Sequence, residues 1–181
     1  MKTVLVLLVF LVVLALAGLG FIYSGAYDVA ADSEHTGMVQ WVLETTQSRS
    51  VHRRAEQVRP PAWIGNPSPE VLRQGLVHYE DLCATCHGAP GAAASPIGEG
   101  LNPHPPELAL EAEEPEEVFW VTKHGIKMTG MPSFGVSLDD EEIWKIVAAA
   151  GRLPEMTKEE YEKRLAGETP GVETPGGGAE L

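Results

Sequence analysis

The sequence predicts an all-α fold: one membrane-spanning helix at the N-terminus, followed by a soluble domain of three to five helices joined by long loops. Several segments repeat apolar residues at helical spacing, and no segment alternates apolar and polar residues as a half-buried strand would. Proline and glycine separate these segments, as expected for loops between helices.

The first predicted element is a transmembrane helix. Residues 3–23 carry no charged side chain, and a helix of about 20 residues spans the ~30 Å hydrocarbon core of a bilayer. A signal-peptide core is shorter, roughly 7–15 residues. We therefore predict an uncleaved signal-anchor over residues 1–25, although Ala15-Leu16-Ala17 and the small residues after it also resemble a cleavage site.

The flanking charges predict how this helix is oriented. Lys2 precedes the apolar run, Asp28, Asp32 and Glu34 follow it, and the next basic residue is Arg49. Basic residues favour the cytoplasmic side. We expect a single-pass protein of the cytoplasmic membrane, with everything after the helix on the outer, periplasmic side.

Residues 26–68 are predicted to form a juxtamembrane connector and a helix. One face of this helix holds Met38, Trp41, Val42 and Thr45. Its C-terminal end is basic, with Arg49, Arg53 and Arg54. Such a helix either packs on the folded domain or lies on the membrane near anionic headgroups. The proline-rich segment 59–69 marks the expected domain boundary.

The folded domain is expected to cover residues 69–165. Pro69 begins a helix whose apolar face holds Leu72, Gly75, Leu76 and Tyr79. A helix containing Pro115 stops at Gly125, and a third, with Ser137 and Asp140 resembling a capping box, stops at Gly151. A short polar helix follows, and the glycine- and proline-rich residues 166–181 are expected to be disordered.

Two features limit the function. The net charge of −13 would repel phosphate backbones, so nucleic acid is not an expected partner. Residues 88–106 form a long loop, which in a compact domain is unusual unless something other than protein fills the space beside it.

The two cysteines of the chain lie in the sequence CATCH, as Cys83, Cys86 and the adjoining His87. A redox CxxC pair usually follows a strand, which is not predicted here. A structural zinc site needs four ligands, so His104 or His124 would have to complete it. A disulfide would not need the histidine. Covalent haem uses all three residues, because both thiols add to the vinyl groups and the imidazole coordinates the iron.

A methionine as sixth iron ligand would give an electron carrier of raised potential. Met131 lies in a loop before Pro132, which restricts the backbone there, and we prefer it to Met128 of the same loop. His124, at the end of the preceding predicted helix, is the rival ligand, whereas His78 is poorly placed.

The order of these motifs resembles a known family. A helix with Gly75 and Tyr79, then CATCHG, a long loop with PHPPEL, the segment GIKMTGMPSFG and a helix opening IW resemble a monohaem class I cytochrome c over about residues 69–154. The N-terminal part is similar to membrane-anchored bacterial cytochromes c.

The resemblance implies a class I cytochrome c haem domain holding one covalent haem (heme c). It implies that Cys83 and Cys86 bind the haem, that His87 and Met131 are axial ligands, and that Pro106 and Leu108 line the pocket. Gly75 would let the first and last helices cross closely, with Tyr79 and Trp144 packing nearby. Unlike carriers with a lysine ring, this domain is acidic.

The implied function is electron transfer without catalysis, either as a free shuttle or as the cytochrome subunit of a larger oxidoreductase. The implied partners are redox proteins: a quinol–cytochrome c reductase, a terminal oxidase or a periplasmic dehydrogenase. The membrane lipid would be contacted through the N-terminal helix. An enzyme or gas sensor would instead leave the sixth iron position open, and a zinc- or disulfide-stapled domain would be colourless.

Overall fold

The computed structural model describes residues 2–167, and its contacts divide the chain into two compact units, residues 1–35 and 36–181. The predicted limits of the domains stay a prediction, and all of the predicted tail beyond residue 167 lies outside the described residues.

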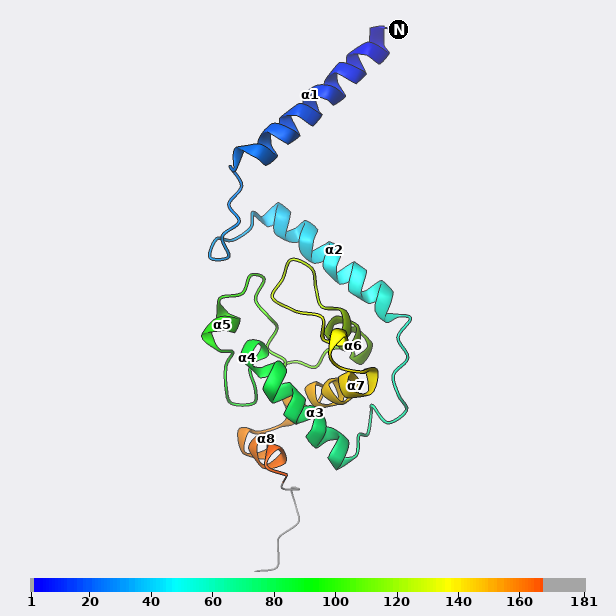
Figure 1. Cartoon of the computed structure of the whole chain (residues 1–181), viewed down its shortest axis with the longest axis vertical. Helices are drawn as coiled ribbons and strands as arrows, with labels where there is room; N and C mark the ends of the chain where they lie inside the picture. The colour runs from blue at the N-terminus through cyan, green and yellow to red at the C-terminus, as the bar shows by residue number, and fades with distance from the viewer. Residues whose placement is uncertain (1, 168–181) are drawn as a thin grey trace, which may run out of the picture. The chain divides into compact units, whose positions relative to one another are not determined.

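The first unit is a helix and a short connector. Helix α1 (Lys2–Ser24) is long and apolar enough to cross a membrane, as predicted (Figure 1). The connector then folds on itself: the Tyr27 hydroxyl and the His35 Nδ1 atom are 2.7 Å apart, and their rings are stacked. The Ser33 hydroxyl donates to Asp28 within the same loop.

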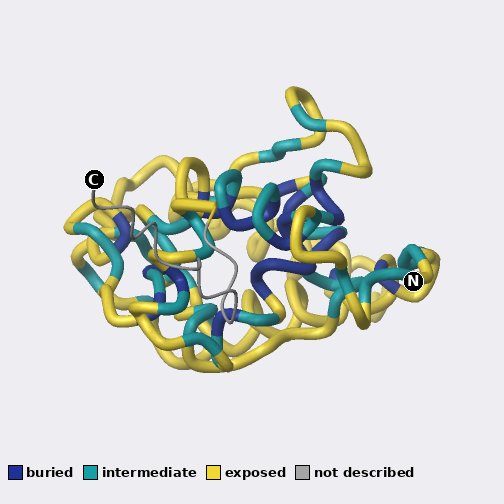
Figure 2. Tube along the Cα trace, turned by 90° about the horizontal axis from the view of Figure 1, so that it is seen from below, coloured by how far each residue is buried: buried dark blue, intermediate teal, exposed yellow. Residues whose placement is uncertain are grey.

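The second unit is helical, and residues 36–167 contain no strand, only an isolated bridge between Ala89 and Ala92. Loops separate its short helices, and the buried segments, dark blue in Figure 2, are short stretches among exposed ones. The helices are α2 (Gly37–Ala55), α3 (Pro69–Leu82), α4 (Ala84–His87), α5 (Pro96–Glu99), α6 (Pro115–His124), η1 (Phe134–Val136), α7 (Asp140–Ala150), η2 (Leu153–Glu155) and α8 (Lys158–Leu165).

The crossing of α3 and α7 forms the centre of this unit. A Cβ atom on Gly75 would collide with the Lys145 carbonyl oxygen and lie 2.6 Å from its carbon. Only glycine therefore permits this approach, as predicted. The four apolar-face residues of α3 are all buried, and α7 buries seven of its residues, so the crossing keeps water from the start of the CATCH sequence.

Helix α7 begins later than the predicted capping box placed it. The cap is Asp139, whose carboxylate accepts from the Glu142 N–H while the Glu142 carboxylate accepts from the Asp139 N–H. The Ser137 and Asp140 pair was therefore wrong, because Ser137 instead follows η1, where its hydroxyl donates to the Phe134 carbonyl.

Helix α2 packs on the domain through its C-terminal half. Val51 and Ala55 are buried, the helix contacts α6, and His52 Nδ1 lies 2.9 Å from the Glu117 carboxylate. Of the two predicted arrangements, packing on the folded domain or lying on the membrane, the C-terminal half of α2 thus adopts the first.

Candidate haem site

The CATCH residues form a single helical turn at the end of α3. Cys83 is the C-cap of α3, and its carbonyl accepts hydrogen bonds from the N–H groups of Cys86 (3.0 Å) and His87 (2.9 Å). The turn α4 therefore holds both thiols and the imidazole on one rigid piece of backbone. Both cysteines are free thiols rather than a disulfide.

The two thiols differ in environment. Cys83 is buried among the apolar side chains of α3 and α7, whereas Cys86 is partly exposed. Burial raises the pKa of the Cys83 thiol to about 12, because the apolar surroundings disfavour the thiolate. A redox-active cysteine needs a lowered pKa, and burial acts in the opposite direction on this thiol.

The backbone after the turn is fixed by Tyr79. Its hydroxyl, on a fully buried side chain, donates a 2.7 Å hydrogen bond to the Gly88 carbonyl. Gly88 has a φ of +69°, a left-handed conformation in which a glycine costs least. The chain can therefore reverse directly behind His87.

The His87 ring is oriented by the long loop. Its Nδ1 lies 2.8 Å from the Pro106 carbonyl oxygen, and a carbonyl can only accept, so Nδ1 carries the proton. Burial lowers the pKa of His87, which favours the neutral ring. Its Nε2 lone pair is thus free for a metal ion, the arrangement expected of a histidine ligand.

The long loop returns over the CATCH turn. The Ser95 N–H donates to the Thr85 carbonyl (3.0 Å), and a Cβ atom on Gly98 would lie 2.8 Å from the Cys86 Cα. Loop residues 88–106 thus contact the turn through backbone at close range. Gly98 and the Pro106 carbonyl were not predicted in these roles, because neither leaves a signal in side-chain chemistry.

The methionine loop has its own internal bonds. Gly125 ends α6 with a φ of +66°, and the Ile126 N–H donates to the Met131 carbonyl (3.2 Å). The Met131 N–H donates to the Thr129 hydroxyl (3.1 Å). The Ser133 hydroxyl donates to the Lys123 carbonyl (2.7 Å). The backbone of Met131 is therefore held on both sides.

The two methionines of this loop are placed differently. Met131 is partly buried, whereas Met128 is 99% exposed. The backbone of Met128 has a φ of +63°. A Cβ atom on Gly130 would lie 2.6 Å from a Leu101 methyl carbon. The methionine loop therefore contacts the same long loop whose Pro106 carbonyl holds His87, and of its two methionines Met131 is the one that is partly buried.

The fold and the site agree with a comparison against protein families. Residues 70–148 match the family described as cytochrome c oxidase, cbb3-type, subunit III. The chain carries a cytochrome c domain. The comparisons with curated proteins and with solved structures gave no match.

The cytochrome domain implies covalently bound haem c, and the Cys83–Cys86 pair is consistent with attachment through a CxxCH sequence. The residues fit this group in their chemistry: two free thiols and one imidazole with an available Nε2. The protein is an electron-transfer haem protein, and its N-terminal apolar helix is consistent with a single-pass membrane anchor.

The two histidines considered as alternative metal ligands, His124 and His104, lie at the surface. His124 is exposed, and its ring lies 5.0 Å from the Trp120 ring; His104 is exposed as well. Within residues 2–167 no group of three or more His, Cys, Asp or Glu side chains is placed to hold a metal ion. The zinc alternative for CATCH therefore gains no support from this structure.

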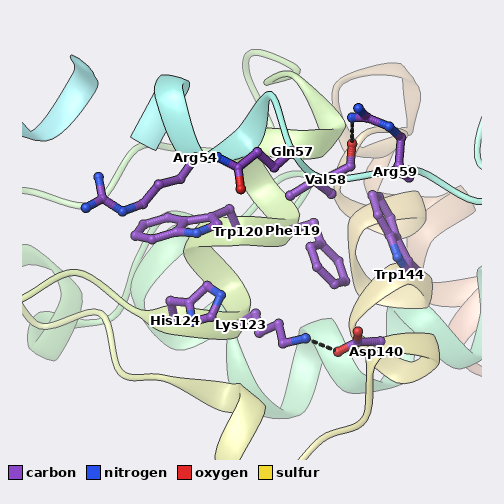
Figure 3. A pocket seen from close by; sticks show the side chains of 10 residues that line it. All are labelled: Arg54, Gln57, Val58, Arg59, Phe119, Trp120, Lys123, His124, Asp140 and Trp144. Carbon is purple, nitrogen blue, oxygen red and sulfur yellow. Dashed lines mark hydrogen bonds and ion pairs between the residues drawn. The ribbon is translucent and has the colours of Figure 1, made fainter. Parts of the chain in front are cut away.

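The cytochrome also has a hollow of about 380 Å³ between the end of α2 and helices α6 and α7. Its rim is cationic and its floor aromatic, as Figure 3 shows: Arg54 lies over Trp120, Phe119 stacks on Trp144, and Lys123 pairs with Asp140 (2.6 Å). None of the four predicted haem-binding residues lines it.

Proposed function

We propose that this cytochrome is a membrane-anchored carrier of single electrons, with Cys83 and Cys86 as the thioether residues and His87 and Met131 as the axial ligands. Haem c, when bound, supplies an iron centre that gains or loses one electron. Four side chains of this chain would hold it. The domain limits 1–25, 26–68, 69–165 and 166–181 belong to the same proposal.

The observation that carries the proposal is the hydrogen bond from His87 Nδ1 to the Pro106 carbonyl. It fixes the ring and its tautomer, so that Nε2 keeps its lone pair for the iron and the imidazole needs little rearrangement. A histidine ligand whose other nitrogen donates to a carbonyl is a better donor and is held in place.

Met131 is proposed as the opposite ligand because its loop is held by the Thr129 and Ser133 hydrogen bonds. A thioether is a neutral, soft ligand that raises the reduction potential of a haem. If His87 and Met131 both ligate the iron, they would keep water and small gases from it, which suits electron transfer rather than catalysis.

The proposed location is the periplasmic face of the cytoplasmic membrane, because Lys2 precedes the span, acidic residues follow it, and basic residues favour the cytoplasmic side. The proposed partner is a terminal oxidase, since the family matched is a subunit of a cbb3-type oxidase. The cytochrome would act as a subunit of such an oxidase or deliver electrons to it. A quinol–cytochrome c reductase or a periplasmic dehydrogenase would supply the electrons.

The proposal is tested by making the full chain in a host that matures c-type cytochromes. We expect haem to stay on the polypeptide in a denaturing gel and to titrate reversibly with one electron. The Cys83→Ala/Cys86→Ala double variant should lose haem from the gel. Each single variant should keep one thioether and shift the reduced visible band to longer wavelength. Haem that leaves the wild-type chain on denaturation would contradict the attachment.

A further inference from the structure

Helix α2 has a second face that the fold does not use. Its N-terminal half exposes large apolar side chains: Met38 is 79% exposed, Trp41 65% and Val42 46%. On a helix, with 100° between successive residues, these three and Arg49 and Arg53 lie within about a third of the circumference. Val51 and Ala55, which are buried, point roughly 120° away.

The two ends of this exposed face differ in character. The first two turns are apolar, and Arg49 and Arg53 follow, both exposed. In the described part of the chain no carboxylate pairs with either arginine. Glu56, further along the face, is engaged by His52 at 3.8 Å. The face thus combines apolar insertion with two available cations, the pattern of an interfacial helix.

The connector ties the start of α2 closely to the membrane span. Only Gly25 and Ala26 separate α1 from Tyr27, and only Thr36 separates His35 from α2. The hydrogen bond and ring stacking of Tyr27 on His35 close the connector into a loop. An extended residue spans at most about 3.6 Å, so α2 begins within a short chain length of the bilayer.

We propose that the N-terminal half of α2 lies in the headgroup region of the bilayer, with Met38, Trp41 and Val42 inserted and with Arg49 and Arg53 against anionic lipid phosphates. The inference rests on the proposed anchoring by α1. Tryptophan favours this region of a bilayer because its ring is apolar and its N–H is polar.

Such a contact would orient the haem domain. The second half of α2 is packed on α6, and α6 leads directly into the methionine loop through Gly125. A surface-bound α2 therefore limits rotation of the domain above the membrane. It favours one presentation of the haem site to partners embedded in the same membrane.

The test uses the full-length holoprotein in nanodiscs of phosphatidylcholine and phosphatidylglycerol that contain a photoreactive phosphatidylcholine. Cleavage after glutamate releases residues 35–44 as one peptide, separate from residues 1–34, which contain the span. Lipid adducts on 1–34 report the anchor, and adducts on 35–44 report α2. The visible spectrum confirms that each variant keeps its haem.

We expect adducts on both peptides. Trp41→Gln, which adds no cleavage site, should lower the yield on residues 35–44 about tenfold without changing that on 1–34, since burying one large apolar side chain is worth roughly a decade in an equilibrium constant. Arg49→Gln/Arg53→Gln should lower it only when phosphatidylglycerol is present. The control Leu110→Glu, at a side chain 74% exposed, should change neither peptide.

Two results would overturn the inference while leaving the anchor intact. One is adducts confined to residues 1–34. The other is a halving of the particle mass by Trp41→Gln in detergent, which would show that a second copy of the chain covers this face. Absence of adducts on residues 1–34 would overturn the anchor and the α2 inference together.

Discussion

The α3–α7 crossing and the methionine loop hold the two sides of the same proposed haem site by different means. The crossing is a close helix contact around Gly75, sealed by buried apolar side chains, and it carries Cys83 at its end. The methionine loop has no helix of its own at Met131, and a few hydrogen bonds hold it. Damage to the crossing should therefore affect global stability, whereas damage to the loop should affect ligation.

The largest expected effect comes from breaking the crossing. Gly75→Ala places a Cβ against the Lys145 backbone, and because backbone cannot rotate away, we expect a loss of about 3 kcal/mol in the free energy of unfolding. Urea unfolding followed by circular dichroism measures it. Gly65→Ala, where a Cβ meets nothing within 4 Å, is the control and should stay within about 0.5 kcal/mol. Equal losses in both variants would refute the close crossing.

A smaller effect is expected where the crossing meets the CATCH turn. Tyr79→Phe removes the donor to the Gly88 carbonyl and leaves that buried oxygen unpaired, which costs about 1–2 kcal/mol. The same unfolding measurement detects it. Tyr161→Phe is a matched comparison, since its hydroxyl donates to the Glu80 carboxylate at the edge of the core. A neutral Tyr79→Phe would mean that the Gly88 carbonyl finds another partner.

The loop alone is tested by Thr129→Val, which removes the acceptor of the Met131 N–H. We expect little change in the free energy of unfolding in urea. Ligation of the iron by Met131 should weaken by about 1 kcal/mol, so added imidazole, which competes for the same position, should bind roughly fivefold more tightly. Imidazole titration of the oxidised protein measures this. An unchanged affinity together with lost stability would show that the loop behaves like the crossing.

The smallest effect is expected at the exposed start of α3. The hydrogen bond from Arg73 lowers the pKa of Glu70 to about 2. A carboxyl with a lowered folded-state pKa stabilises the fold above its ordinary pKa, and this contribution is lost as the pH falls from about 4.5 toward 2. Glu70→Gln should therefore flatten the acid side of the stability profile slightly, measured by thermal unfolding between pH 2 and 6. An unchanged slope would assign acid sensitivity to other carboxyls.

The sequence predicted the helices of the crossing well, because buried faces leave periodic patterns. Pro69, the face around Gly75 and the stop of α7 at Gly151 were all readable as residue types with a fixed structural consequence. The cap of α7 was missed by two residues, because several nearby Ser and Asp side chains could cap the same helix, and the pair that forms the capping box is Asp139 with Glu142.

The site was predictable only where side chains carry the chemistry. CATCH and the loop methionines are visible as residues, and the structure separates the exposed Met128 from the partly buried Met131. The Pro106 carbonyl and the close approach of Gly98 to Cys86 were not predictable. They are backbone contacts between segments far apart in sequence, and any residue could supply the carbonyl.

The most direct test of the central claim is carbon monoxide binding by the reduced holoprotein, followed by visible absorption in the wild type, Met131→Ala and Met128→Ala. We predict that wild type and Met128→Ala stay six-coordinate and unchanged, whereas Met131→Ala binds carbon monoxide. Binding by wild type, or by Met128→Ala while Met131→Ala stays unchanged, would contradict ligation of the iron by His87 and Met131.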